Sequence, residues 1–187
     1  MPTALQRATR DLALIQVYNE LIEYDISLDL VGSSDVRLHF VTHMVVANRS
    51  SSVVDYRDVF DPVGRDNEFI AMAIDGIGID PNDRDYIYGR GRQLFQRLQP
   101  GQRLDVRVEG ASTFHAQDDE LIGTYLPCER MIIRLAPPPS GLSVSFQSLL
   151  DGKIDVQQRV DGSRVFETKR GLLPFQGARL TWTVDTP

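Results

Sequence analysis

The sequence predicts a mainly β fold, an antiparallel β-sandwich of about eight to ten strands preceded by one amphipathic α-helix. Three observations lead to this prediction. From residue 23 onward, apolar and polar residues alternate with a period of two in many short segments. Glycines, prolines and aspartates that favour turns separate these segments. Only the first 22 residues follow a helical period instead. We expect the chain, residues 1–187, to form a single domain.

The predicted helix covers residues 3–22. Apolar residues recur there at steps of three and four, and neither glycine nor proline interrupts them. Leu5, Leu12 and Ile15 also fit the seam of a short coiled coil. We favour packing of this helix against its own domain and keep self-association through the helix, as a homodimer, as the alternative.

The rest of the chain, 23–187, is predicted to form the sandwich. A first strand is expected at 26–30, and a turn at 32–35 leads to a long strand at 36–46. Further strands are expected at 53–60, 70–79 with a bend at Gly76 and Gly78, 92–98, 104–108, 131–135, 142–147, 154–160, 164–168 and 180–184. The segment 92–98 also fits a helical turn, but a strand there would let Pro100 and Gly101 close a hairpin with 104–108. Residues 113–120, which contain His115, are predicted to be an exposed loop.

The composition excludes several classes of protein. The chain has 26 acidic and 20 basic residues, a net charge of −6, and this negative total argues against general nucleic-acid binding. It contains no apolar run of the ~20 residues that a membrane span requires. The single cysteine, Cys128, cannot form an intramolecular disulfide, and the first residues do not resemble a signal peptide. We therefore predict a soluble, cytoplasmic protein without a membrane association.

No catalytic motif stands out. The sequence has no Gly-x-Ser-x-Gly elbow, no phosphate-binding loop and no dinucleotide fingerprint. His39 and His43 are four residues apart on a predicted strand, roughly 13 Å, which is too far for two ligands of one zinc ion. Cys128 lacks a histidine partner and a helix start, so we interpret it as a structural thiol. We predict no catalytic residues, no metal and no cofactor, and keep a hydrolase or isomerase built on carboxylates and His115 as an alternative.

A first candidate site is the segment 80–92, where tyrosines and arginines alternate with glycines. Glycine lets backbone N–H groups approach an anion, and arginine supplies a bidentate fork. A sensor domain that binds a small anionic or phosphorylated ligand here is therefore kept as an alternative function. The candidate residues are Asp80, Asp83, Tyr86, Tyr88, Arg90 and Arg92. We favour an edge hairpin whose arginines pair with neighbouring aspartates.

A second candidate is the segment 171–177, which is apolar for a loop. Leu172, Leu173 and Phe175 are candidates for contact with a partner, because aromatic and apolar side chains are favoured in interface cores. We favour a loop folded over the open end of the sandwich and keep the partner contact as the alternative. From these patterns we predict a non-catalytic binding or interaction module whose partner is another protein or a second copy of itself.

Overall fold

The protein is mainly β. The computed structural model describes residues 16–32, 34–60, 64–80, 92–149, 155–168 and 171–185, and no helix occurs among them. The strands in these ranges are β1 (Val17–Val31), β2 (Asp35–Asn48), β3 (Val54–Phe60), β4 (Arg65–Ile74), β5 (Ile77–Ile79), β6 (Arg92–Leu98), β7 (Arg103–His115), β8 (Gln117–Gly123), β9 (Met131–Leu135), β10 (Leu142–Ser148), β11 (Asp155–Gln158), β12 (Arg164–Glu167) and β13 (Gly177–Val184). The predicted β class is therefore confirmed.

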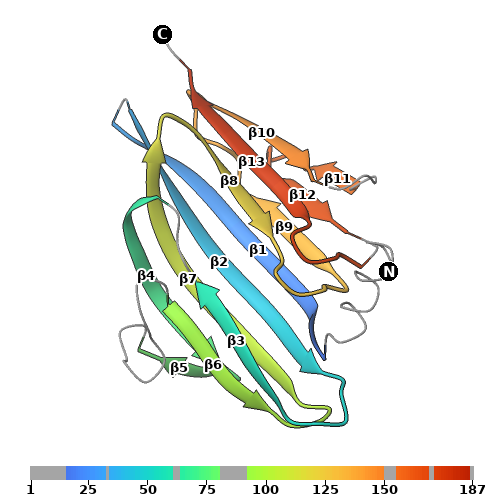
Figure 1. The fold of residues 1–187 in the computed structure, drawn as a ribbon. Helices are drawn as coiled ribbons and strands as arrows, with labels where there is room; N and C mark the ends of the chain where they lie inside the picture. The colour runs from blue at the N-terminus through green and yellow to red at the C-terminus, as the bar shows by residue number, and fades with distance from the viewer. Residues whose placement is uncertain are drawn as a thin grey trace, which may run out of the picture.

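These strands form three sheets (Figure 1). The largest has eight strands in the order β11-β12-β9-β1-β2-β7-β4-β5, a second has the order β10-β13-β8, and β3 pairs with β6. The long antiparallel strands β1, β2 and β7 lie at the centre of the large sheet. Of the described pairs, only β1 and β9 run parallel.

The large sheet has an apolar and a charged face because side chains alternate along each strand. On β2, Val36 and Val46 are fully buried, and Met44 lies opposite the buried Val106 of β7. We call this side the inner face. The intervening residues, such as His43, which lies opposite Arg107, point to the other side, which we call the outer face.

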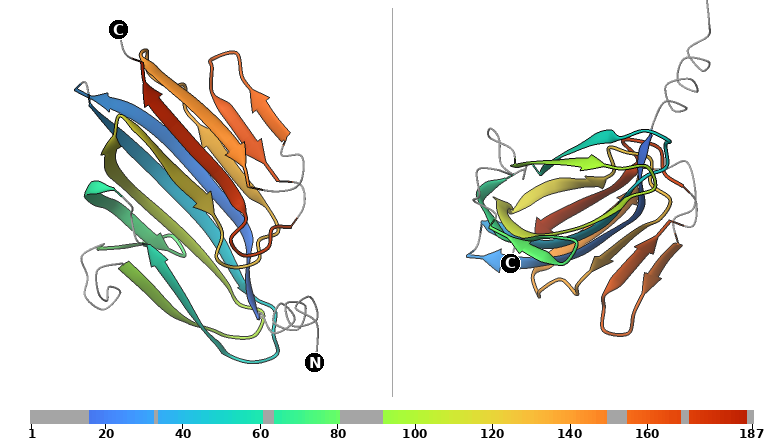
Figure 2. Two further views of the ribbon diagram at one scale, coloured as in Figure 1. Left: turned by 45° about the horizontal axis from the view of Figure 1, so that its top comes forward. Right: turned by 90° about the horizontal axis from the view of Figure 1, so that it is seen from below.

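The two smaller sheets pack on the inner face. Trp182 of β13 contacts Phe114 of β7 edge to face, with ring centroids 5.1 Å apart. Toward the opposite edge of the large sheet, Phe146 of β10 stacks on Phe166 of β12. From β6, Leu94 is fully buried in the same hydrophobic core. Figure 2 shows the smaller sheets lying over one side of the long central strands.

The predicted helix at 3–22 is wrong in its last turn and a half. Residues 17–22 belong to β1, whereas Leu5, Leu12 and Ile15 lie outside the described residues. A β-bulge between Asn19 and Leu21 shifts the side-chain alternation by one residue. Buried positions therefore change from odd to even numbers along β1, and this phase change imitates a helical stripe. Self-association through the segment 3–15 stays a prediction.

Two other local predictions need correction. The expected loop at 113–120 is instead the end of β7 and most of β8. The expected bent strand at 70–79 is the β4–β5 hairpin, which turns at Asp75 and Gly76, both with positive φ. The segment 92–98 is a strand, as predicted, but it pairs with β3 rather than with β7.

The described residues contain no helix that is long and apolar enough to cross a membrane.

Candidate binding groove

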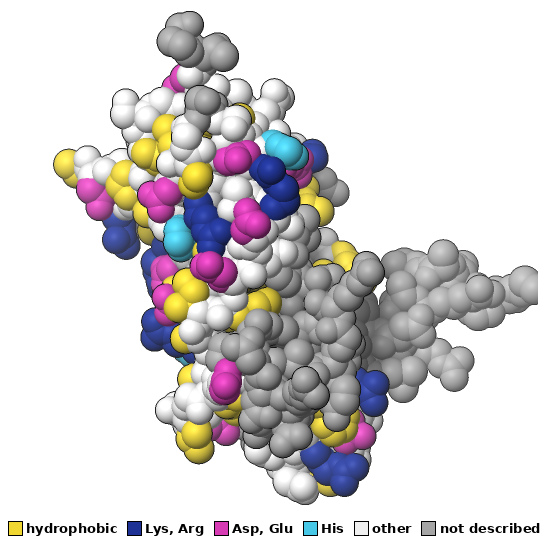
Figure 3. All heavy atoms as spheres, turned by 90° about the vertical axis from the view of Figure 1, so that its left-hand side faces the viewer, with side chains coloured by type: hydrophobic (Ala, Val, Ile, Leu, Met, Phe, Trp, Pro, Cys, Tyr) yellow, Lys and Arg dark blue, Asp and Glu magenta, His cyan; other side chains and the backbone are white. Residues whose placement is uncertain are grey.

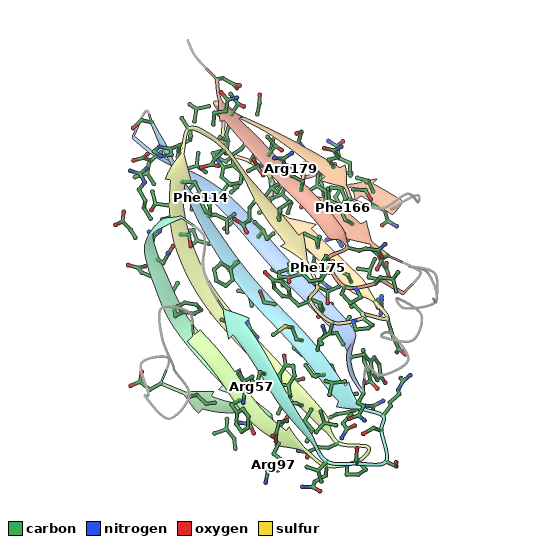
Figure 4. All side chains as sticks on the ribbon, viewed as in Figure 1. Arg57, Arg97, Phe114, Phe166, Phe175 and Arg179 are labelled. Atoms are coloured by element: carbon green, nitrogen blue, oxygen red, sulfur yellow. The ribbon has the colours of Figure 1, made fainter. Side chains whose placement is uncertain are left out.

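In the described residues, the two smaller sheets are not paired with each other over the middle of the inner face. Between β8 and β3 there is a groove of about 690 Å³. Its floor comes from the large sheet: Tyr24, Ile26, Leu38, Phe40, Thr42, Phe69, Ser112 and Phe114. In Figure 4, Phe175 lies on the β8–β13 side and Arg57 lies on β3. The floor is mostly apolar with a few hydroxyl groups, the usual composition of a ligand site.

Exposed apolar side chains form the rim on the β8 side. Leu121, Tyr125 and Phe175 are each more than half exposed, and the rings of Tyr125 and Phe175 meet edge to face at 5.9 Å. Phe175 has a φ of 65°, in the left-handed region that bulky residues avoid. A hydrogen bond of 2.7 Å from its backbone N–H to the carbonyl oxygen of Thr124 helps to hold this conformation. The strained backbone keeps an aromatic ring at the surface beside the groove.

Polar groups are few within the groove. The Tyr24 hydroxyl donates a hydrogen bond to the carbonyl oxygen of Gly123 at 3.0 Å, which ties β1 to the end of β8. On the opposite side, the guanidinium group of Arg57 lies 5.3 Å from the ring centre of Phe95. The groove therefore has a basic side chain on its β3 side and, as described next, a carboxylate on its β8 side.

Glu120 supplies that carboxylate. It lies opposite the buried Leu180 in the β8–β13 register and on the same face of β8 as the buried Ile122. Its side chain is thus directed inward and lines the groove. Burial, with a contribution from the charges of Asp119 and Asp118, raises the pKa of Glu120 to about 7. Only a backbone hydrogen bond at Leu121 acts in the opposite direction.

The raised pKa predicts a pH-dependent effect of Glu120→Gln on stability. The folded chain keeps a proton on Glu120 up to about pH 7, whereas the unfolded chain releases it near 4.5. Stability is therefore lost as the pH rises from 4.5 through 7. Glu120→Gln removes this loss, so its Tm should exceed that of the wild type by a few degrees at pH 8 and by little at pH 4. Calorimetry at pH 4 and at pH 8 measures this difference in Tm. Glu129→Gln, which changes an exposed carboxylate, is the control, and an equal Tm difference at both pH values would contradict the assignment.

The outer face of the large sheet is charged but largely paired with itself. His43 lies between Glu23 and Asp105, at 3.3 and 2.9 Å, and Arg134 contacts Glu23 at 2.6 Å. The hydrogen bond with Asp105 is the largest cause that raises the pKa of His43. Figure 3 shows acidic, basic and histidine side chains next to one another on the side of the molecule that it presents. Because these charges satisfy each other, we place the candidate site in the groove instead.

The predicted anion site falls almost entirely outside the described residues. Asp80 is exposed just after β5, and Arg92 begins β6. Asp83, Tyr86, Tyr88 and Arg90 lie in the undescribed segment 81–91, so this site stays a prediction.

The predicted interaction segment is divided by the structure. Leu172 is buried, Leu173 is exposed, and Phe175 lines the groove.

Cys128 is buried, and burial raises its pKa to about 11, in agreement with a structural thiol. His115 is exposed at the end of β7, and its carbonyl oxygen accepts a hydrogen bond from the Trp182 indole. Among the described residues, no group of three or more His, Cys, Asp or Glu side chains is arranged to hold a metal ion.

Comparison with known proteins gives a fold but no family. No family model and no curated protein matches the sequence. Among solved structures, an M1 zinc metallopeptidase from Deinococcus radiodurans has a TM-score of 0.55 at 15% identity, over 90% of this chain and 42% of that one. Yeast LTA4 hydrolase has a TM-score of 0.56 at 9% identity, over 92% and 30% of the two chains. A putative protease from Parabacteroides distasonis has a TM-score of 0.52 at 10% identity, over 89% and 40%. The chain thus spans less than half of each.

Proposed function

We propose that this protein is a non-catalytic interaction module that receives an extended segment of a partner protein in the groove between β8 and β3. The observation that carries this proposal is the groove between the two smaller sheets, whose floor is mostly apolar in the described residues. In this proposal the three sheets form an incomplete sandwich, and the partner segment completes its second layer. Burial of the exposed apolar rim and of partly exposed floor residues such as Phe40 would provide the free energy of binding.

The edge of β8 supports an extended partner. Within the described residues β8 pairs with β13 alone and β3 with β6 alone, so each has an edge without a strand partner. An added strand can use the backbone N–H and C=O groups of such an edge, while its alternate side chains enter the groove. The strained, exposed Phe175 lies beside this edge and can cover the added strand.

The similar solved structures are compatible with such a role. In each of the three chains above, the shared fold makes up less than half of the length. A fold of this kind therefore occurs together with further polypeptide in those proteins. For this chain we propose contact with a separate partner, and the activities named for the similar chains carry no weight in the proposal.

The proposal predicts that an uncharged apolar dye binds the groove and that an extended peptide displaces it. Nile red should gain fluorescence with the full-length protein, and the peptide acetyl-Val-Thr-Val-norleucine-Val-Thr-amide should reverse the gain. Phe175→Asp should weaken the binding of both the dye and the peptide roughly tenfold, because it places a charge on the apolar rim. Ile77→Asp is the matched control, since Ile77 is 71% exposed and Phe175 79%, and Ile77 does not line the groove.

The same experiment can contradict the proposal. Equal weakening by both aspartate variants would show that the dye binds elsewhere, and a dye that no peptide displaces would exclude an extended partner. Light scattering separates a foreign partner from a second copy. If the protein forms dimers and Phe175→Asp dissociates them, the occupant of the groove is a second copy of this chain rather than a foreign partner.

A further inference from the structure

We propose that the groove selects a segment with a basic side chain, whose ammonium or guanidinium group lies against the carboxylate of Glu120. This inference rests on the function proposed above and adds the chemistry of the partner. It concerns one position of the inserted segment, the position that faces the inner side of β8.

The Glu120 carboxylate has a backbone hydrogen bond at Leu121 and can accept further hydrogen bonds. Its carboxylate is directed toward a floor made mostly of apolar side chains, beside Ile122 and opposite Leu180. An ionised carboxylate accepts hydrogen bonds and cannot donate them. In an apolar setting its charge is stable only with a partner, and a cation that donates hydrogen bonds is the strongest one. A lysine suits the groove because its aliphatic stem can lie on the apolar floor while its ammonium group reaches Glu120.

The surrounding charges favour a basic segment over an acidic one. Asp118, Asp119 and Glu120 are consecutive on β8, and Arg179 of β13 pairs with Asp119 through two contacts of 2.8 and 3.0 Å. Asp118 accepts a hydrogen bond from the backbone N–H of Asp119 at 2.9 Å. This edge therefore keeps a net negative charge, which repels acidic segments and protects the edge from indiscriminate pairing.

The remaining titratable groups of the groove do not replace the missing cation. They are Tyr24 on the floor, Tyr125 at the rim and Arg57 on the β3 side. The Tyr24 hydroxyl already donates to Gly123, and Arg57 lies over Phe95. Neither Arg57 nor any other described cation is among the groups that lower the pKa of Glu120. A cation from outside would therefore meet a carboxylate that this chain leaves without an ionic partner in the described residues.

The proposed contact depends on pH. The pKa of Glu120 is about 7, so the carboxylate is largely protonated at pH 6 and largely ionised at pH 8. A bound cation favours the ionised form. Affinity for a basic segment should therefore rise between pH 6 and pH 8, whereas affinity for a neutral segment should not rise.

Three peptides that differ at one position test the inference. They are acetyl-Val-Thr-Val-X-Val-Thr-amide with X as lysine, norleucine or glutamate, and each displaces Nile red from the full-length protein. At pH 8 the lysine peptide should bind roughly tenfold more tightly than the norleucine peptide, as expected for one charge-assisted hydrogen bond, and the glutamate peptide most weakly. Glu120→Gln should remove the lysine preference and its pH dependence while norleucine binding persists. Glu129→Gln should leave both unchanged.

The outcomes separate this inference from the proposed function. If no peptide displaces the dye, the proposed function itself fails. If lysine and norleucine peptides bind equally, or if the lysine preference survives in Glu120→Gln, only the assignment of Glu120 fails. A preference that is equal at pH 6 and pH 8 would likewise overturn the role of the Glu120 charge.

Discussion

Replacing Asn48 by aspartate is expected to lower the free energy of unfolding by about 3–5 kcal/mol, the cost of leaving an uncompensated charge in a protein interior. Asn48 is fully buried at the end of β2. Its side-chain N–H groups donate to the carbonyl oxygens of Ser52, Leu98 and Gln99, at 2.8, 3.0 and 3.2 Å. An aspartate would direct a negative oxygen at these three carbonyl groups and leave all of them without their donor.

Urea denaturation measures this effect. Asn67→Asp is the control, because the Asn67 side chain also donates to a carbonyl oxygen, that of Gly64 at 3.2 Å, but at the surface. The control should change the unfolding free energy by no more than about 0.5 kcal/mol. Similar losses in the two variants would mean that burial of Asn48 does not determine its contribution.

Asn48 also explains which part of the fold local sequence patterns could not predict. Asn48 follows the predicted strand 36–46. Nothing in the local pattern shows that Asn48 also binds the turn after β6, where the backbone N–H of Gly101 donates to the carbonyl oxygen of Asn48 at 2.8 Å. This connection joins two turns that are about fifty residues apart, and it places β6 beside β3. The hairpin between 92–98 and 104–108 was expected only because these two segments are neighbours in the sequence.

The strand content was predictable wherever alternation is regular, as on β2 and β7. The prediction of strands failed where the alternation of apolar and polar residues is interrupted. The bulge after Asn19 imitated a helix, and the consecutive acids of β8 concealed a strand whose inward positions include Glu120. The apolar loop with Phe175 was recognised as a candidate contact surface. The groove beside it was not, because its floor combines residues of β1, β2, β4 and β7, and their proximity follows from strand order rather than from any local pattern.

Gly177→Ala is expected to lower the free energy of unfolding by about 1–3 kcal/mol, the range for atoms forced into a packed site. Gly177 begins β13 and lies opposite Gly123 of β8. A Cβ atom at Gly177 would overlap the carbonyl oxygen of Ile122 and come within 2.5 Å of the Gly123 Cα. Both are backbone atoms, which cannot turn aside as a flexible side chain can. The start of β13 would have to move away from β8.

That movement should also change the groove, because Gly177 and Gly123 both line it. We therefore expect Gly177→Ala to weaken Nile red binding as well as the fold. Gly78→Ala is the matched control, since a Cβ atom there would meet nothing within 4 Å. Urea denaturation followed by the fluorescence of Trp182, the single tryptophan, compares the two variants. Equal stability of both would show that β13 and β8 separate at little cost, and the groove would then have no fixed wall on its β8 side.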